Sequence, residues 1–256
     1  MTHFIPKLAV FGLVASASFV LAQDYNAAPP MGQLNAALSD DRTLFNVTID
    51  SRPDDDLLEL GRLVAMGGAQ KGGSGMACIA CHGANGQGDG SGAFPRLAGQ
   101  AGWYSYKQLM DYASGVRPNP IMSGIAQRLT EREMEAVAAY YAAMDSPYLP
   151  VLGDVPASLL QWGGQLGAVG SAERGIPACV NCHGAAGSGL PPSVPYLAGQ
   201  YATYSAYQLK LWRDGVRNND AMNVMSSIAS KMTDEDMKAV AEYYARVRPM
   251  LPVAGE

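Results

Sequence analysis

Apolar residues recur at helical spacing in several stretches of the chain, and no stretch shows the strict apolar–polar alternation of a β-strand. In the clearest stretch, Met134, Val137 and Tyr141 fall on one face of a helix. Thr130 and Glu133 form a capping box, which is typical of a helix start. The pattern predicts an all-α fold with helices over residues 57–69, 102–114, 157–169 and 202–214, and two more that start at residues 130 and 233.

The sequence contains an internal repeat. Residues 94–117 and 194–217 align without a gap and share Pro-x-Leu-Ala-Gly-Gln, Tyr-Ser, Gln-Leu and Gly-Val-Arg. Two flanking segments also repeat, CIACHGA against CVNCHGA and AVAAYYA against AVAEYYA. Such self-similarity indicates a duplicated domain. We expect a first domain over residues 57–147, a linker with several prolines over 148–156 and a second domain over 157–256.

The first 22 residues have the pattern of a secretory signal peptide. Lys7 precedes an apolar stretch from Leu8 to Leu21, and Ala22 offers a cleavage point. A retained membrane anchor is the alternative, but the stretch is shorter than the ~20 residues that a span needs. We therefore expect cleavage near Ala22 and export to the periplasm.

Acidic charge is concentrated after the signal peptide. Residues 23–60 carry eight acidic and two basic side chains, although the whole chain has a net charge of only −5. We expect residues 23–56 to form an acidic leader that is partly disordered. The remainder is close to neutral, which gives no indication of a nucleic-acid-binding surface.

The four cysteines and two of the three histidines fall in two matching Cys-x-x-Cys-His motifs. In this spacing, two thiols on a tight turn can each add to a vinyl group of haem, and the adjacent histidine is placed to bind the iron. Haem would also supply the apolar centre that three short helices lack. The motifs predict two covalently bound haem c groups, one on Cys78, Cys81 and His82 and the other on Cys179, Cys182 and His183.

Other uses of the cysteines fit less well. A four-cysteine zinc site would require the two pairs to meet and would leave the histidines without a role. A thioredoxin-like disulfide needs a βαβ context, which the sequence does not show. Structural disulfides between cysteines three residues apart would close very small loops and add little stability.

The second axial ligand of each iron is a methionine or is absent, because the mature chain has no spare histidine or cysteine. Met122 and Met225 occupy matching places, each three residues before Ile-Ala and shortly before the last helix. Met222 is the nearest rival but has no counterpart in the first half. We expect His82 with Met122, and His183 with Met225, to bind the irons, a ligand pair that raises the reduction potential.

The order of Cys-x-x-Cys-His, Pro-x-Leu-Ala-Gly-Gln, methionine and a last helix with Ala-x-Tyr resembles a class I cytochrome c module. Two such modules behind a signal peptide resemble cytochrome c4 and its di-haem relatives, over about residues 57–249. The resemblance implies short helices and loops around each haem, with the haem edges near the domain interface. It implies that the carbonyls of Pro95 and Pro195 accept hydrogen bonds from the ligand histidines, and it suggests Tyr104, Tyr204, Arg117 and Arg217 as neighbours of the haem propionates.

These features predict an electron carrier rather than an enzyme. The carrier would pass single electrons between respiratory complexes, from a quinol-oxidising complex to a terminal oxidase, and would associate with the membrane through those partners. The alternative is a haem c subunit of a periplasmic dehydrogenase or oxidase complex. A di-haem peroxidase or a thiosulfate-oxidising di-haem enzyme fits less well, because each would use an additional histidine or cysteine ligand that the mature chain lacks.

Overall fold

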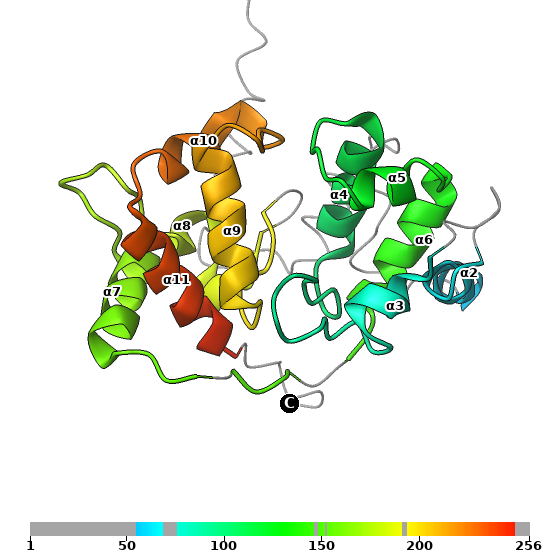
Figure 1. The fold of residues 1–256 in the computed structure, drawn as a ribbon, viewed down its shortest axis with the longest axis horizontal. Helices are drawn as coiled ribbons and strands as arrows, with labels where there is room; N and C mark the ends of the chain where they lie inside the picture. Colours follow the sequence, from blue (N-terminus) through cyan, green and yellow to red (C-terminus); the bar gives the residue numbers. More distant parts are fainter. Residues whose placement is uncertain (1–54, 69–75, 146–147, 152, 191–193, 249–256) are drawn as a thin grey trace, which may run out of the picture.

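The described part of the chain forms two helical lobes that lie side by side, one from each sequence repeat (Figure 1). The computed structural model describes residues 55–68, 76–145, 148–151, 153–190 and 194–248. Over these residues there are helices and two isolated β-bridges but no β-strand, which confirms the all-α prediction. No helix among them is long and apolar enough to span a bilayer. The expected signal peptide, and the acidic leader up to residue 54, lie outside the described residues.

Within the described residues, the first half and the second half repeat the same order of α-helices, and the second half adds two short 3₁₀ helices, η1 and η2. The helices of the first half are α2 (Asp55–Ala65), α3 (Cys78–His82), α4 (Gly102–Ser114), α5 (Met122–Ala126) and α6 (Glu131–Ala142). Those of the second half are α7 (Ala157–Ala168), α8 (Val180–His183), η1 (Ala185–Gly187), α9 (Ala202–Arg213), η2 (Ala221–Asn223), α10 (Val224–Ala229) and α11 (Asp234–Arg246). The two halves are therefore structural as well as sequence repeats.

The last helix of each half begins with a capping box, as predicted. The Thr130 hydroxyl accepts a hydrogen bond from the Glu133 amide at 3.2 Å, and the Glu133 carboxylate accepts one from the Thr130 amide at 2.8 Å. Thr233 and Asp236 make the same pair of bonds at 3.1 and 2.8 Å. Both carboxylates are buried, and these bonds replace the water that each would lose.

The first helix differs from the prediction at both ends. Its described part already includes Asp55 and Asp56, the last two residues of the expected leader, ahead of the predicted start at residue 57. Acidic side chains are stabilised in a first helical turn by the helix dipole, which explains why the helix extends over Asp55 and Asp56. It ends at Ala65 rather than at residue 69, and Gly67 then adopts a positive φ of 97° that helical residues do not have.

The first and last helices of each half cross in close contact at a glycine. A Cβ atom on Gly61 of α2 would lie 2.1 Å from the Ala136 carbonyl oxygen of α6. A Cβ atom on Gly163 of α7 would lie 2.1 Å from the equivalent carbonyl oxygen of Ala239 in α11. Only glycine permits backbones to approach this closely, so each crossing depends on that residue.

Candidate haem sites

A cavity of about 760 Å³ lies between the two halves, and residues from both halves line it. Its walls are mainly apolar, which suits a large apolar group with a few polar substituents. The helices α4 and α9 face each other across this region (Figure 1). Every predicted site residue lines the cavity: Cys78, Cys81, His82, Pro95, Met122, Cys179, Cys182, His183, Pro195 and Met225.

Each motif histidine ends a short helix and has one nitrogen fixed by a proline carbonyl. Nδ1 of His82 donates to the Pro95 oxygen at 2.9 Å, and Nδ1 of His183 donates to the Pro195 oxygen at 3.0 Å. Burial lowers the pKa of both rings by more than these bonds raise it. Each ring is therefore neutral with its proton on Nδ1, which leaves Nε2 free to bind a metal.

The cysteines lie on the same short helical turns as the histidines. No cluster of three or more metal-binding side chains occurs among the described residues, so the two cysteine pairs do not meet there as a four-cysteine zinc site requires. Burial raises the pKa of Cys78 and of Cys179 to about 11. A redox-active thiol has a lowered pKa, so a thioredoxin-like role is also disfavoured.

Met122 and Met225 reach the cavity from equivalent positions near the start of α5 and α10. The Asn119 side chain accepts a hydrogen bond from the Met122 amide at 2.8 Å, and the Asp220 carboxylate accepts one from the Met225 amide at 2.6 Å. Met222, by contrast, is 92% exposed and does not line the cavity. This geometry favours the predicted pair over its rival, and their binding to iron stays a prediction.

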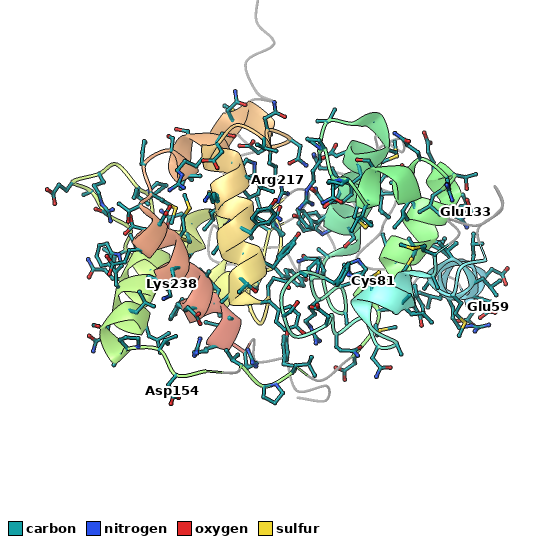
Figure 2. All side chains as sticks on the ribbon, in the orientation of Figure 1. Glu59, Cys81, Glu133, Asp154, Arg217 and Lys238 are labelled. Atoms are coloured by element: carbon teal, nitrogen blue, oxygen red, sulfur yellow. The ribbon has the colours of Figure 1, made fainter. Side chains whose placement is uncertain are left out.

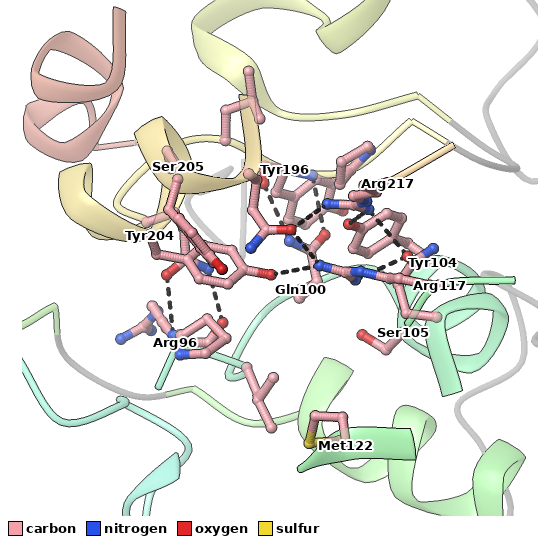
Figure 3. Close-up of a pocket in the computed structure, with 18 of the residues that line it drawn as sticks. Arg96, Gln100, Tyr104, Ser105, Arg117, Met122, Tyr196, Tyr204, Ser205 and Arg217 are labelled. Carbon is pink, nitrogen blue, oxygen red and sulfur yellow. Dashed lines mark hydrogen bonds between the residues drawn. The ribbon is translucent and has the colours of Figure 1, made fainter. Parts of the chain in front are cut away.

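The four residues suggested as propionate neighbours form a reciprocal hydrogen-bond network between the halves. Arg117 donates to the Tyr204 hydroxyl at 3.1 Å, and Arg217 donates to the Tyr104 hydroxyl at 3.2 Å. Figure 3 shows both arginines lying together between the two tyrosines, and in Figure 2 Arg217 lies between the lobes. Such an exchange of equivalent contacts is typical of a twofold arrangement.

Two glutamines, whose role was not predicted from the sequence, complete this network. Gln108 of α4 accepts from Arg117 at 2.9 Å and from Arg217 at 3.1 Å. Gln208 of α9 accepts from Arg117 and from Arg217, each at 2.7 Å. The available signal was the Gln-Leu pair that both repeats contain, but a shared polar residue in a helix does not reveal which way it faces.

Two observations of the described residues fit haem. Arg117 and Arg217 are 4% and 3% exposed, yet their guanidinium groups donate there to amide and hydroxyl oxygens rather than to carboxylates. Buried cations need an anionic partner, which the haem propionates would supply. In addition, the buried Nε1 of Trp212, a cavity residue, has no hydrogen-bond partner among the described residues. A propionate oxygen would satisfy it.

The model of the cytochrome c family matches the chain twice, over residues 71–144 and 176–247. The chain is 47% identical over 186 residues to the "Thiosulfate dehydrogenase electron acceptor" of Stutzerimonas stutzeri, covering 73% of this chain and 85% of that protein. It is 37% identical to cytochrome c4 of Pseudomonas aeruginosa, over 65% of this chain and 81% of that one.

A solved structure of thiosulfate dehydrogenase from Marichromatium purpuratum is also similar, with a TM-score of 0.68 and 36% identity over 75% of this chain. The chain spans 40% of the length of that protein. The relatives of this chain therefore include both cytochrome c4 and a longer thiosulfate dehydrogenase.

Proposed function

Because the chain belongs to the cytochrome c family, with two modules in tandem, we propose that it is a periplasmic di-haem carrier that accepts electrons from a thiosulfate dehydrogenase. The chain carries electrons and is not itself a catalyst. The observation that supports the carrier most strongly is that both Cys-x-x-Cys-His motifs, with Met122 and Met225, line one cavity between the halves. Two haems in a common cavity can exchange electrons within the molecule.

The two halves would each hold one haem c. The thiols of Cys78 and Cys81 attach the first haem, and His82 and Met122 bind its iron; the corresponding residues of the second domain are Cys179, Cys182, His183 and Met225. When bound, haem supplies an iron that exchanges one electron at a time. The chain's own residues orient the histidines through Pro95 and Pro195 and neutralise the propionates through Arg117 and Arg217.

The proposed donor rests on the relatives. The match named for thiosulfate dehydrogenase is 47% identical, against 37% for the cytochrome c4 of P. aeruginosa, and it covers more of this chain. A dehydrogenase donor also agrees with the alternative drawn from the sequence, a haem subunit that serves a periplasmic dehydrogenase. The electrons would then pass to a terminal oxidase.

The donor can be tested by mixing the purified oxidised protein with thiosulfate dehydrogenase and thiosulfate and following haem reduction by stopped-flow absorption. We expect complete reduction of both haems at a rate that depends on thiosulfate, and none when thiosulfate is omitted. Reduction by a quinol-oxidising complex but not by the dehydrogenase would overturn the proposed donor and leave the electron carrier intact.

The proposed location can be tested separately. Export predicts that the protein is released with the periplasmic fraction and that its mature N-terminus follows Ala22. Recovery in the membrane fraction with Lys7 still present would contradict cleavage and indicate a retained anchor.

A further inference from the structure

The Leu-Ala-Gly-Gln motif of each repeat places its glutamine against the other half of the molecule. The Gln200 side chain pairs with the backbone of Arg96: its oxygen accepts from the Arg96 amide at 3.0 Å, and its nitrogen donates to the Arg96 carbonyl at 3.0 Å. Gln100 pairs in the same way with Tyr196, at 3.0 Å and 3.1 Å. Figure 3 shows Gln100 and Tyr196 facing each other.

The residues that these glutamines hold directly follow the prolines that orient the motif histidines. The amide nitrogen of Arg96 and the carbonyl of Pro95 belong to one peptide group, and that carbonyl accepts from His82. Both ends of this peptide group are therefore hydrogen-bonded: its N–H donates to Gln200 of the other half, and its carbonyl accepts from His82. A continuous chain of two hydrogen bonds joins the glutamine to the histidine.

The second half contains the equivalent chain in the opposite direction. The Gln100 oxygen accepts from the Tyr196 amide, and the Pro195 carbonyl of the same peptide group accepts from His183 at 3.0 Å. Hydrogen bonds in a chain polarise one another, so an acceptor on the amide makes the carbonyl oxygen a stronger acceptor. A stronger acceptor makes the histidine a more basic ligand.

We propose that Gln100 and Gln200 are positioning residues, each of which tunes the haem-ligand histidine of the opposite half. This inference rests on the two-haem function proposed above. A more basic histidine stabilises ferric iron, so each glutamine lowers the reduction potential of the haem in the other half. Each haem is thereby tuned by a side chain of the other half, so its potential depends on the docking of the two halves.

The geometry explains why glutamine occupies both places. Pairing with an amide and a carbonyl of one residue requires a side chain that both accepts and donates in one plane, as a carboxamide does. Each side-chain oxygen also accepts from the backbone amide of the following residue, Gln100 from Ala101 at 3.0 Å and Gln200 from Tyr201 at 3.1 Å. This second bond fixes the orientation of the amide group. Glutamate would present an acceptor to the carbonyl and lose that bond.

The two couplings differ in strength because their surroundings differ. Arg96 is 8% exposed, whereas Tyr196 is 40% exposed. Hydrogen bonds that are shielded from water are electrostatically stronger. The Gln200 chain should therefore affect the His82 haem more than the Gln100 chain affects the His183 haem.

The test compares Gln200→Met and Gln100→Met with the unmodified protein, since methionine keeps the length but not the hydrogen bonds. The reduction potential of each haem is followed by NMR through hyperfine-shifted haem resonances assigned to their own half. We expect Gln200→Met to raise the potential of the His82 haem and to leave that of the His183 haem unchanged. Gln100→Met should raise the potential of the His183 haem alone, by a smaller amount.

Thr203→Val is the matched control. The Thr203 hydroxyl donates to the Ser91 carbonyl of the other half at 2.6 Å, but this bond does not end at a proline peptide. Thr203→Val should therefore leave the reduction potentials of both haems unchanged. As a second measurement, exchange of the His82 ring N–H with solvent should be faster in Gln200→Met and unaltered in Thr203→Val.

Three results would overturn the inference: a shift in the haem of the variant's own half, an equal shift in both haems, or no shift at all. If a methionine variant does not assemble, the corresponding asparagine variant, Gln200→Asn or Gln100→Asn, takes its place. Asparagine keeps the amide but is too short to make both bonds, so the same haem should change its potential in the same direction. The unmodified protein is titrated first. Failure to find two reducible haems there would refute the proposed function, independently of any result with the glutamine variants.

Discussion

The guanidinium groups of Arg117 and Arg217, which come from opposite halves, donate to the same oxygen of Gln208, each at 2.7 Å. Two buried cations so close together repel each other, and an amide oxygen neutralises neither. Anions beside the two arginines would relieve this repulsion. Two haem propionates next to the arginines would provide negative charge, so we expect haem attachment to strengthen the docking of the two halves.

Replacement of one arginine tests this relationship. Arg217→Leu removes a buried positive charge that favours ferrous over ferric iron, so the reduction potentials should fall. A charge within roughly 10 Å of another contributes about 1–2 kcal/mol at an effective dielectric constant of about 20. This corresponds to a decrease of ~40–90 mV for one electron, measurable by spectroelectrochemical titration.

The control is Arg213→Leu, because Arg213 is bound to Asp234 and Asp214 at the surface rather than in the interface. The reduction potentials of the Arg213→Leu variant should stay within a few millivolts of those of the unmodified protein. Unchanged potentials in Arg217→Leu would mean that this arginine does not lie beside a propionate.

The helix crossings provide a test of stability. Gly163→Ala would place a Cβ atom 2.1 Å from the Ala239 carbonyl oxygen, and backbone atoms cannot move aside cheaply. We expect the free energy of unfolding of the second half to fall by about 1–3 kcal/mol or more, as overpacking does. Chemical denaturation followed by circular dichroism measures it.

Gly124→Ala is a suitable comparison, because no atom outside its own helix and its chain neighbours lies within 4 Å of the added Cβ atom. This variant should be as stable as the unmodified protein or slightly more so, since alanine favours a helix. Equal stability of both variants would contradict the prediction, because it would mean that the α7–α11 crossing has room for an added Cβ atom.

The stability of the second half should also depend on pH through Asp236. Although burial raises the pKa of this carboxyl, hydrogen bonds from Arg174, the Thr233 amide and Trp162 outweigh it and lower the pKa to about 2. A lowered folded-state pKa adds stability above the unfolded value of 3.8, and the stability is lost as the pH falls towards 2. The contribution at pH 7 is about 2 kcal/mol.

Denaturation at pH 7 and at pH 3 separates this carboxyl from the others. Asp236→Asn should be destabilised at pH 7 and should lose less stability than the unmodified protein between the two pH values. Asp234→Asn is the control, because Asp234 is 80% exposed and its ion pair with Arg213 contributes little. The same pH dependence in all three proteins would exclude Asp236 as its source.

The sequence predicted the fold well where long periodic segments and caps occur, as at Thr130 and Thr233. It did not predict α5 or α10, because helices of five and six residues contain too little periodicity to recognise. The repeat identified the candidate site residues, since it isolates the few positions that both halves share. It could not show that Gln100 and Gln200 cross to the other half, because a repeat aligns residues within each module and contains no information on how the modules dock.

The choice between Met225 and Met222 is decided by absorption spectroscopy. Met225 lines the cavity, whereas Met222 is exposed and has a positive φ of 57° in the three-residue turn η2. Met225→Leu should abolish about half of the weak red absorption band of methionine-ligated ferric haem, because one of two haems loses its ligand. That haem should then bind carbon monoxide when reduced. Met222→Leu, the matched control, should retain the whole band and bind none. The opposite result would assign the ligand to Met222 and require η2 to fold inwards when haem is attached.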